Sequence, residues 1–296
     1  MSERIGFIGL GIMGIPMCRN LMKAGFACVT YTRTKSRADG LLSEGAVWAE
    51  SPAAVAAQSD IIITMVTDTP DVERVLLEEN GVIEGATPGS VVIDMSTISP
   101  SATQDMAAAL AEKGVEMLDA PVSGGDKGAI AGTLSIMVGG KQEVFDRCLP
   151  VFQAMGKNIN LIGDIGAGQM TKLCNQVAVS VTNLAMAEAL LFGAKAGLNL
   201  EKMLAAISGG AAGSWQLSNL APRVIKRDFA PGFMVSLQQK DLRLVLGAAS
   251  EMGVGLPGVS LVHQLFNTIE AAGEGNEGTQ ILVKALERMA GIEVKG

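Results

Sequence analysis

Histidine is almost absent from this chain of 296 residues, which contains one histidine, one tyrosine and two tryptophans. The one histidine, His263, falls in an apolar stretch at 259–266 that has helical spacing. A Ser–His–Asp triad or a histidine-based metal centre needs partners that this stretch does not offer. We therefore interpret His263 as a structural residue and expect neither a catalytic triad nor a metal site.

Cysteine is sparse as well, with four residues that form no C-x-x-C pair. Disulfide frameworks and zinc sites are built from regularly spaced cysteines, so this scatter is typical of a reduced cytosolic chain. The beginning of the sequence lacks the charged and apolar regions of a signal peptide. We therefore expect a cytoplasmic protein.

Clusters of positive charge and long hydrophobic runs are also missing. The formal net charge is −7 and the sequence pI is about 4.9, which argues against a nucleic-acid-binding surface. The most apolar long segment, 173–198, is interrupted by amide and charged residues, as in a buried helix of a soluble protein. We expect no nucleic-acid partner and no membrane, and an anionic ligand must be held by local groups.

Glycine, by contrast, is abundant, and three of the 36 glycines form a G-x-G-x-x-G spacing between an apolar run at 4–8 and a helical pattern at 16–25. In dinucleotide sites the first glycine permits a tight turn, and the second allows the backbone to come close to the pyrophosphate. The third allows the helix to pack closely against the strand. Backbone N–H groups at the start of the helix then face the anion. The predicted cofactor-binding residues of this segment are Gly9, Leu10, Gly11, Ile12, Met13 and Gly14.

Short apolar runs alternate with helical segments through the first half of the chain. After a second strand at 27–31, the runs are 61–66, 91–95, 116–120 and 134–138. This alternation predicts an α/β fold with a Rossmann-like, doubly wound, mostly parallel sheet covered on both faces. Beyond about Gly163 the periodicity is helical almost throughout. We expect a dinucleotide-binding domain at 1–163 and an all-α domain at 164–296 that begins with a long inter-domain helix.

The carboxyl ends of the predicted parallel strands should rim one crevice, because ligands of such sheets bind there. The five rim segments are 9–14, 31–34, 65–68, 95–99 and 120–125. Met65 and Val66 follow the third of these strands and are further candidates for contact with the cofactor.

The segment after the second strand carries no carboxylate. A site that prefers NAD usually places an acidic residue there for the ribose hydroxyls, whereas a 2′-phosphate needs an arginine nearby. Here Arg33 could pair with the phosphate and stack on the adenine, and Thr34 could donate a hydrogen bond. We favour NADP(H), and NAD(H) stays possible. The alternative is that these residues form a solvated loop.

Lys172 lies near the start of an otherwise apolar helical pattern. At helical spacing it shares a face with Asn175, Gln176 and Val179, and Asn183 returns near that face. One interpretation is that Lys172 extends to solvent while the amides cap neighbouring loops. The other is that Lys172 donates a proton to a carbonyl oxygen as hydride arrives from a nicotinamide.

The chain as a whole resembles the β-hydroxyacid dehydrogenase family, which includes 3-hydroxyisobutyrate dehydrogenase and the tartronate semialdehyde, glyoxylate and succinic semialdehyde reductases. Four motifs in this order carry the resemblance, at 6–14, 119–125, 168–175 and 240–242. The resemblance implies that Lys172 is the catalytic general acid and base. It also implies substrate contacts by Ser123, Gly124, Gly125, Asn175 and Lys240, and cofactor contacts by Ser96, Thr97 and Lys240.

Each of these assignments has a plainer alternative. The segment 123–125 could be a glycine turn after a strand, 96–97 could begin a turn, and Lys240 could be a surface lysine near a helix N-terminus. Gln176 departs from the family pattern, because many relatives carry a second asparagine there. That departure leaves the detailed shape of the substrate pocket open.

The segment 208–216 lacks the asparagine- and proline-rich loop expected of a 3-hydroxyisobutyrate dehydrogenase. We therefore expect an NAD(P)-dependent reductase of a small carboxylate-bearing aldehyde or keto acid, of the tartronate semialdehyde, glyoxylate or succinic semialdehyde type. The alternatives are an oxidative 3-hydroxyacid dehydrogenase, an oxidative decarboxylase of a sugar-acid phosphate, and a non-catalytic dinucleotide-binding scaffold. The resemblance implies a homodimer or homotetramer, and the long apolar helix suggests subunit contacts.

Overall fold

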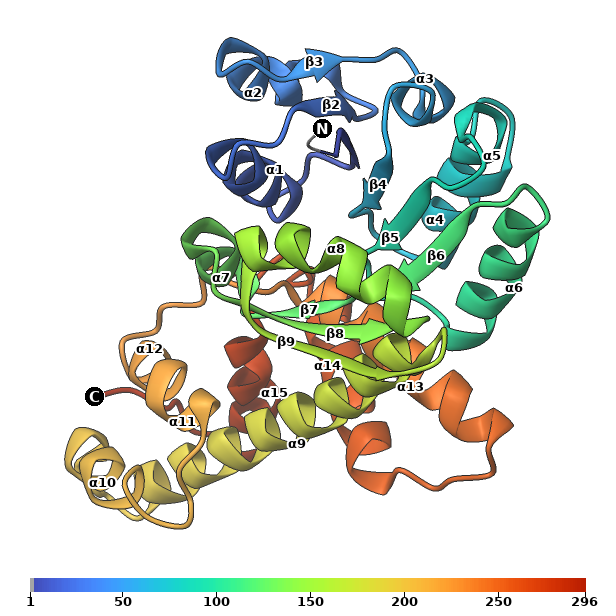
Figure 1. Cartoon of the computed structure of the whole chain (residues 1–296). Coiled ribbons are helices and arrows are strands. Elements are labelled where there is room, and N and C mark those ends of the chain that lie inside the picture. Colours follow the sequence, from blue (N-terminus) through green and yellow to red (C-terminus); the bar gives the residue numbers. More distant parts are fainter. Residues whose placement is uncertain (1–2) are drawn as a thin grey trace. The chain divides into compact units, whose positions relative to one another are not determined.

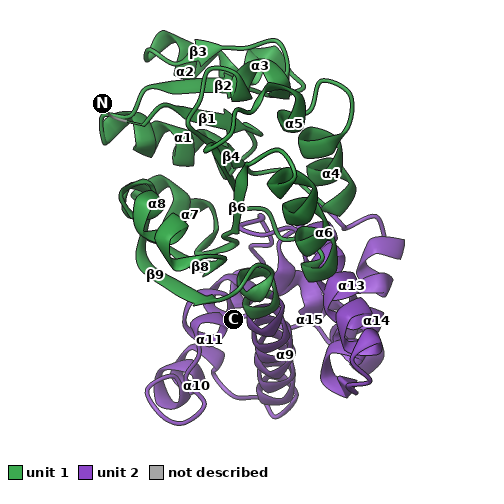
Figure 2. Cartoon of the chain, turned by 45° about the vertical axis from the view of Figure 1, so that its right-hand side comes forward, with its two compact units in different colours: residues 1–172 green, residues 173–296 purple. Residues whose placement is uncertain are grey.

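The computed structural model describes residues 3–296, and the chain divides into two compact units, Met1–Lys172 and Leu173–Gly296 (Figure 2). The boundary expected at 163/164 coincides with the end of strand β9 (Gly156–Gly163). The division between units falls later, inside helix α9 (Ala167–Lys195), because the first turn of α9 is hydrogen-bonded to strands of unit 1.

Unit 1 is built on a sheet with the strand order β3-β2-β1-β4-β5-β6-β8-β7, and β9 pairs with β8 (Figure 1). Its parallel part comprises β1 (Ile5–Ile8), β2 (Cys28–Tyr31), β3 (Val47–Trp48), β4 (Ile61–Thr64), β5 (Val91–Asp94) and β6 (Glu116–Asp119). The strand order reverses direction at β1, which is the arrangement of a doubly wound dinucleotide-binding sheet. The fold class predicted from the sequence is confirmed.

The far side of the sheet differs from the parallel part. Strand β8 (Leu134–Gly139) runs antiparallel to β6 and to the short β7 (Val122–Ser123), and parallel to β9. The sequence predicted β8 but missed β9, whose exposed positions carry Lys157 and Asn158. A half-exposed edge strand presents polar side chains on one face, so it gives no continuous apolar run.

Helices cover both faces of the sheet, as the sequence predicted. Alternate residues of a strand point to opposite faces, and Phe7 and Ile8 accordingly lie in two different apolar clusters. The helices of unit 1 are α1 (Gly14–Lys23), η1 (Lys35–Ala38), α2 (Asp39–Ser43), α3 (Pro52–Ala56), α4 (Thr69–Leu77), α5 (Val82–Gly85), α6 (Pro100–Ala111), α7 (Gly125–Ala131) and α8 (Gln142–Met155). The helices packed against both faces hold the strands in place, and with them the edge of the sheet at which the parallel strands end.

Among the described residues of unit 2, the regular secondary structure is helical apart from one isolated bridge between Met234 and Gly278. Besides the main part of α9, its helices are α10 (Leu200–Ile207), α11 (Trp215–Asn219), α12 (Ala221–Ile225), α13 (Val235–Glu251), α14 (Pro257–Ala271), η2 (Thr279–Ile281) and α15 (Leu282–Ala290). They share one core, in which Leu242, Val262 and Phe266 are fully buried. The helical character expected beyond Gly163 is confirmed, and α9 is the long helix expected at its start.

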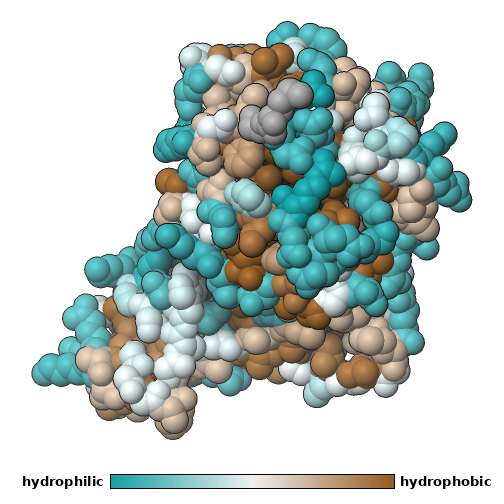
Figure 3. Space-filling model, viewed as in Figure 1, coloured by the Kyte–Doolittle hydropathy of each residue, from teal (hydrophilic) through white to brown (hydrophobic). Residues whose placement is uncertain are grey.

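Helix α9 is long and apolar enough to span a membrane by length and composition, with a mean hydropathy of 1.6. Its polar stripe, however, lies inside the protein: Gln169, Lys172, Gln176 and Asn183 are each less than 9% exposed. On the face shown in Figure 3, hydrophilic and hydrophobic residues are interspersed.

Candidate active site

The glycine motif forms the turn between β1 and α1. Gly9 has a φ of +103°, and a Cβ there would collide with the carbonyl oxygen of Met65. A Cβ on Gly14 would collide with the carbonyl oxygen of Gly9, so this glycine permits the close packing of helix on strand. Gly11 differs, because a Cβ there meets no atom within 4 Å. Open space at Gly11 fits the approach of a pyrophosphate to the backbone.

Helix α1 begins at Gly14 without a protein anion at its positive end. Among residues 3–296, no side chain caps this helix and no acidic residue lies in its first turn. The dipole and N–H groups at this end favour a negatively charged ligand. The residues present therefore fit a dinucleotide cofactor.

The segment after β2 exposes basic and hydroxyl side chains. The Arg33 side chain is 78% exposed, and its guanidinium lies 3.8 Å from the Asp71 carboxylate of α4. Asp71 makes a shorter contact of 3.0 Å with Arg74. Exposed ion pairs of this kind hold a side chain only weakly. Arg33 and the exposed Thr34 can therefore turn to a 2′-phosphate, as NADP(H) requires.

The ends of β4 and β5 bring together further residues predicted to contact the cofactor. The backbone N–H of Val66 donates to the Ser96 hydroxyl at 3.0 Å, and the close approach at Gly9 places Met65 beside the glycine turn. Ser96 is fully buried, whereas Thr97 is half-buried. The structure thus joins Gly9, Met65, Val66 and Ser96 at one edge of the sheet.

Two buried aspartates end the neighbouring strands β5 and β6, in register with each other. Asp94 accepts hydrogen bonds from the Thr64 hydroxyl (2.7 Å) and the Ser96 N–H (3.2 Å), and burial raises its pKa to about 6. Burial also raises the pKa of Asp119, opposed by backbone hydrogen bonds from Gly166 and Gln169. The sequence analysis gave neither carboxylate a role.

The segment predicted to receive a substrate carboxylate follows β6. Ser123 is half-buried at the end of β7, and Gly124 and Gly125 have φ values of +138° and +63°. Only glycine adopts two such successive conformations without strain. A Cβ on Gly124 would also lie 3.1 Å from Leu134. The local geometry thus explains both glycines, and their contact with a substrate stays a prediction.

In unit 2, a hydrogen-bonded chain joins the two predicted substrate residues Asn175 and Lys240. The Asn175 side-chain amide donates to the side-chain oxygen Oε1 of Gln176 at 2.8 Å, and the Gln176 Nε2 donates to the Asp241 carboxylate at 2.5 Å. The Lys240 ammonium lies 2.7 Å from the other oxygen of Asp241. Lys240 is 7% exposed and lies in the second turn of α13, so it is not a surface lysine at a helix start.

Lys172 is the last residue of unit 1 and is 8% exposed, which contradicts the interpretation that it extends to solvent. The sequence analysis gave no role to Asp94, Asp119, Gln169 or Asp241, and it noted Gln176 only as a neighbour of Lys172 on the helix face and as a departure from the family pattern. A signal for the first two was present: each is a carboxylate that ends an apolar strand run, and such ends meet at one edge of a parallel sheet.

Strand order and the glycine turn together place this protein among the dinucleotide-binding proteins. The sequence profile of the NAD binding domain of 6-phosphogluconate dehydrogenase matches residues 4–163, and that of the NAD-binding region of NADP-dependent 3-hydroxyisobutyrate dehydrogenase matches residues 166–286. The chain belongs to the β-hydroxyacid dehydrogenase family, whose members are NAD(P)-dependent and act on the CH–OH group of hydroxyacids.

Similar proteins cover the whole chain. The 2-hydroxy-3-oxopropionate reductase of Escherichia coli is 47% identical over 287 residues, which cover 97% of this chain and 98% of that protein. The 2-(hydroxymethyl)glutarate dehydrogenase of Eubacterium barkeri is 40% identical over 296 residues, covering 100% and 98%. A structure of Mycobacterium tuberculosis 3-hydroxyisobutyrate dehydrogenase with L-serine superposes with a TM-score of 0.89 at 33% identity, covering 97% of this chain and 99% of that one.

Proposed function

We propose that the protein reduces a small carboxylate-bearing aldehyde or keto acid to the hydroxy acid, with Lys172 as the general acid. The observation that carries the proposal is the burial of Lys172, which is 8% exposed on an apolar helix. A lysine held away from bulk water can pass its proton to the carbonyl oxygen of a bound substrate. The full-length similarity to a 2-hydroxy-3-oxopropionate reductase supports tartronate semialdehyde as the first substrate to test, before glyoxylate and succinic semialdehyde.

A nicotinamide cofactor, held by the glycine turn between β1 and α1, would supply the hydride. The Lys172 ammonium donates a proton to the carbonyl oxygen of the substrate, so that the hydroxyl group forms directly and no free alkoxide is released. The Ser123 hydroxyl and the N–H groups of Gly124 and Gly125 receive the substrate carboxylate without a net charge of their own. Asn175 orients the substrate.

Lys240 adds a positive charge for the anionic substrate and cofactor. Its contact with Asp241 at 2.7 Å, together with the bond from Gln176 to that carboxylate, fixes the lysine on α13. Gln176 therefore replaces the second asparagine of many relatives as a link between the substrate-orienting amide and the lysine. This link supports a preformed anion site in unit 2.

The direct test is a panel of tartronate semialdehyde, glyoxylate and succinic semialdehyde, each with NADPH and with NADH, followed by the loss of absorbance of the reduced cofactor. We expect reduction of at least one aldehyde acid, faster with NADPH. Rapid oxidation of 3-hydroxyisobutyrate or L-serine with no reduction of any aldehyde acid would favour the dehydrogenase alternative. Cofactor binding without turnover of any compound would indicate a scaffold.

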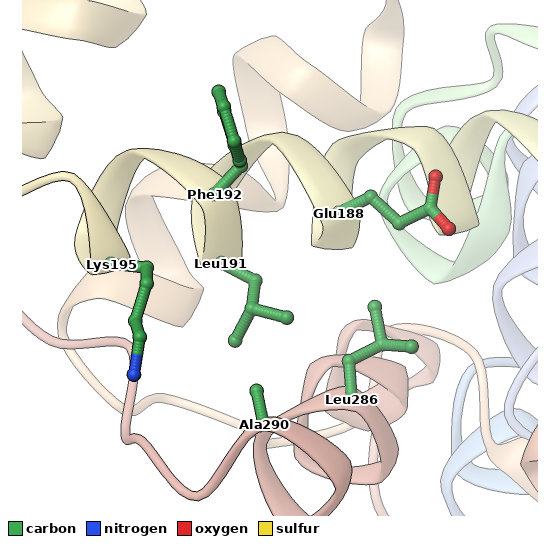
Figure 4. Close-up of a pocket in the computed structure, with 6 residues that line it drawn as sticks. All are labelled: Glu188, Leu191, Phe192, Lys195, Leu286 and Ala290. Atoms are coloured by element: carbon green, nitrogen blue, oxygen red, sulfur yellow. The ribbon is translucent and has the colours of Figure 1, made fainter.

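We also propose that the protein is a cytoplasmic homodimer or homotetramer. An apolar groove between α9 and α15 of unit 2 supports the oligomer (Figure 4). It is lined by Glu188, Leu191, Phe192, Lys195, Leu286 and Ala290, none of which is a predicted site residue. Phe192 is 79% exposed, and burial between subunits would remove this apolar surface from water. Light scattering after gel filtration should show a dimer or tetramer, and Phe192→Glu should shift it towards the monomer.

A further inference from the structure

We infer that Gln169 is a positioning residue, which fixes the helix carrying Lys172 to the loop that follows β5. The inference rests on the proposed function, because it assigns a purpose to the placement of Lys172. All the groups involved belong to unit 1. The placement of the proton donor relative to the loop that is predicted to contact the cofactor is therefore set within the dinucleotide-binding unit.

The side-chain amide of Gln169 binds the loop through both of its ends. Its oxygen accepts from the N–H of Ile98 at 3.1 Å, and its nitrogen donates to the carbonyl oxygen of Ser96 at 2.8 Å. The side chain is fully buried, so water does not compete for either bond. Because one end donates and the other accepts, a single orientation of the amide satisfies both backbone groups.

The backbone of the same helical turn is held by Asp119. Its two carboxylate oxygens accept from the N–H of Gly166 at 2.7 Å and from the N–H of Gln169 at 2.6 Å. A carboxylate at a helix N-terminus satisfies otherwise unpaired N–H groups and complements the helix dipole. The start of α9 is thus bonded to the ends of two adjacent strands, β5 and β6.

Two glycines make this close approach possible. A Cβ on Gly139 of β8 would collide with a carboxylate oxygen of Asp119. A Cβ on Gly168 would collide with the carbonyl oxygen of Met137 and lie 2.8 Å from the main-chain oxygen of Asp119. The family motif at 168–175 therefore begins with a glycine because the helix backbone lies against β6 and β8.

The loop that Gln169 binds contains Ser96 and Thr97, which are predicted to contact the cofactor. The Ser96 hydroxyl of this loop also accepts from the N–H of Val66, so the loop after β5 is hydrogen-bonded to the end of β4 as well. Lys172 follows Gln169 by less than one helical turn, at a rise of about 1.5 Å per residue. A displacement of the first turn of α9 is therefore carried directly to Lys172.

The first test replaces the amide by an apolar side chain of similar length, Gln169→Met. A misplacement of about 1 Å can reduce a catalytic rate about 100-fold. We expect a loss of kcat of that order, with the Kd for NADPH and the substrate KM little changed. Gln104→Met is the matched control, since Gln104 also donates to the start of α9, at the carbonyl oxygen of Ile165 (3.3 Å), but is exposed. The control should retain kcat.

A double-mutant cycle with Lys172→Ala separates positioning from mere structural damage. If Gln169 acts through Lys172, adding Gln169→Met to Lys172→Ala should lower the residual rate by less than about threefold, because the two effects are not independent. Full multiplication of the two losses would overturn the inference and leave the proposed function intact. Near-normal turnover by Lys172→Ala alone would instead remove the proposed function, and the inference with it.

A second variant, Gln169→Glu, keeps the inference testable if the methionine variant does not fold. A protonated carboxyl can donate to Ser96 and accept from Ile98 as the amide does, whereas a carboxylate cannot donate. The titratable groups beside it are Asp94 and Asp119, the last residues of β5 and β6, with Lys172 on its own helix. The ratio of the variant's kcat to that of the wild type should rise as the pH falls from 8 to 6. A ratio that does not change with pH would contradict the inference.

Discussion

Two alanine substitutions in the glycine motif should have opposite effects. A Cβ on Gly11 meets no atom within 4 Å, and Gly11 is not among the glycines with a positive φ, so Gly11→Ala should leave stability unchanged or raise it by up to about 1 kcal/mol. A Cβ on Gly14 collides with the carbonyl oxygen of Gly9. Overpacking of this kind costs about 1–3 kcal/mol.

For NADPH binding the two variants change places: Gly11→Ala should be the impaired one, whereas the effect of Gly14→Ala is on stability. The methyl group of Gly11→Ala occupies the open space in which we expect the pyrophosphate, at a cost of about 1–3 kcal/mol. That cost corresponds to a Kd for NADPH that is about 5-fold to 150-fold higher. Gly14→Ala should instead lower the melting temperature by about 2–12 °C, because 1 kcal/mol shifts it by about 2–4 °C in a domain of this size.

Both quantities can be measured on the same samples, by thermal unfolding without cofactor and by titration of NADPH fluorescence. Normal NADPH binding by Gly11→Ala would refute the assignment of the glycine turn as the pyrophosphate site. A melting temperature of Gly14→Ala equal to that of the wild type would refute the packing argument.

Two further predictions concern charge. Arg33→Ala should lower kcat/KM for NADPH about 10-fold to 150-fold at low salt, as expected for a lost charge-assisted hydrogen bond, and should leave kcat/KM for NADH unchanged. Arg74→Ala is the control. An equal loss with both cofactors would contradict the 2′-phosphate site. Burial raises the pKa of Asp94 to about 6, so its folded form favours the proton more than the unfolded chain does. The stability that this protonation contributes is present below pH 4 and is lost as the pH rises through 6, by about 3 kcal/mol. Urea unfolding should show that the free energy of unfolding of the wild type falls relative to that of Asp94→Asn by about this amount between pH 4 and pH 7, because the other carboxylates contribute equally to both proteins.

Local pattern was enough to predict the parallel strands. Runs such as 61–66 and 91–95 are apolar because a central parallel strand is buried on both faces, and the resulting β4 and β5 are fully buried. Strand β9 was missed because its outer positions are polar, and α15 because its nine residues follow directly on a short 3-10 helix. The family motifs predicted Lys172, Asn175 and Lys240, and the structure shows that all three are at least partly buried.

The hydrogen bonds that support these residues could not be predicted in the same way. Gln169 and Ser96 are 73 residues apart in sequence, and Gln176 and Asp241 are 65 apart. Periodicity places a side chain on a helix face, but strand order and helix packing decide which groups that face meets. Gln176 was noted as a departure from the family pattern, and only the structure shows that it links Asn175 to Asp241.

The most direct test of the account is the turnover of Lys172→Ala, measured together with its affinity for NADPH. Removing a general acid should lower kcat by about 10²-fold to 10⁴-fold while the Kd for NADPH stays at the wild-type value. Lys157→Ala, at an exposed position of β9, is the control and should retain full activity. Turnover of Lys172→Ala close to that of the wild type would contradict the central claim that Lys172 is the proton donor.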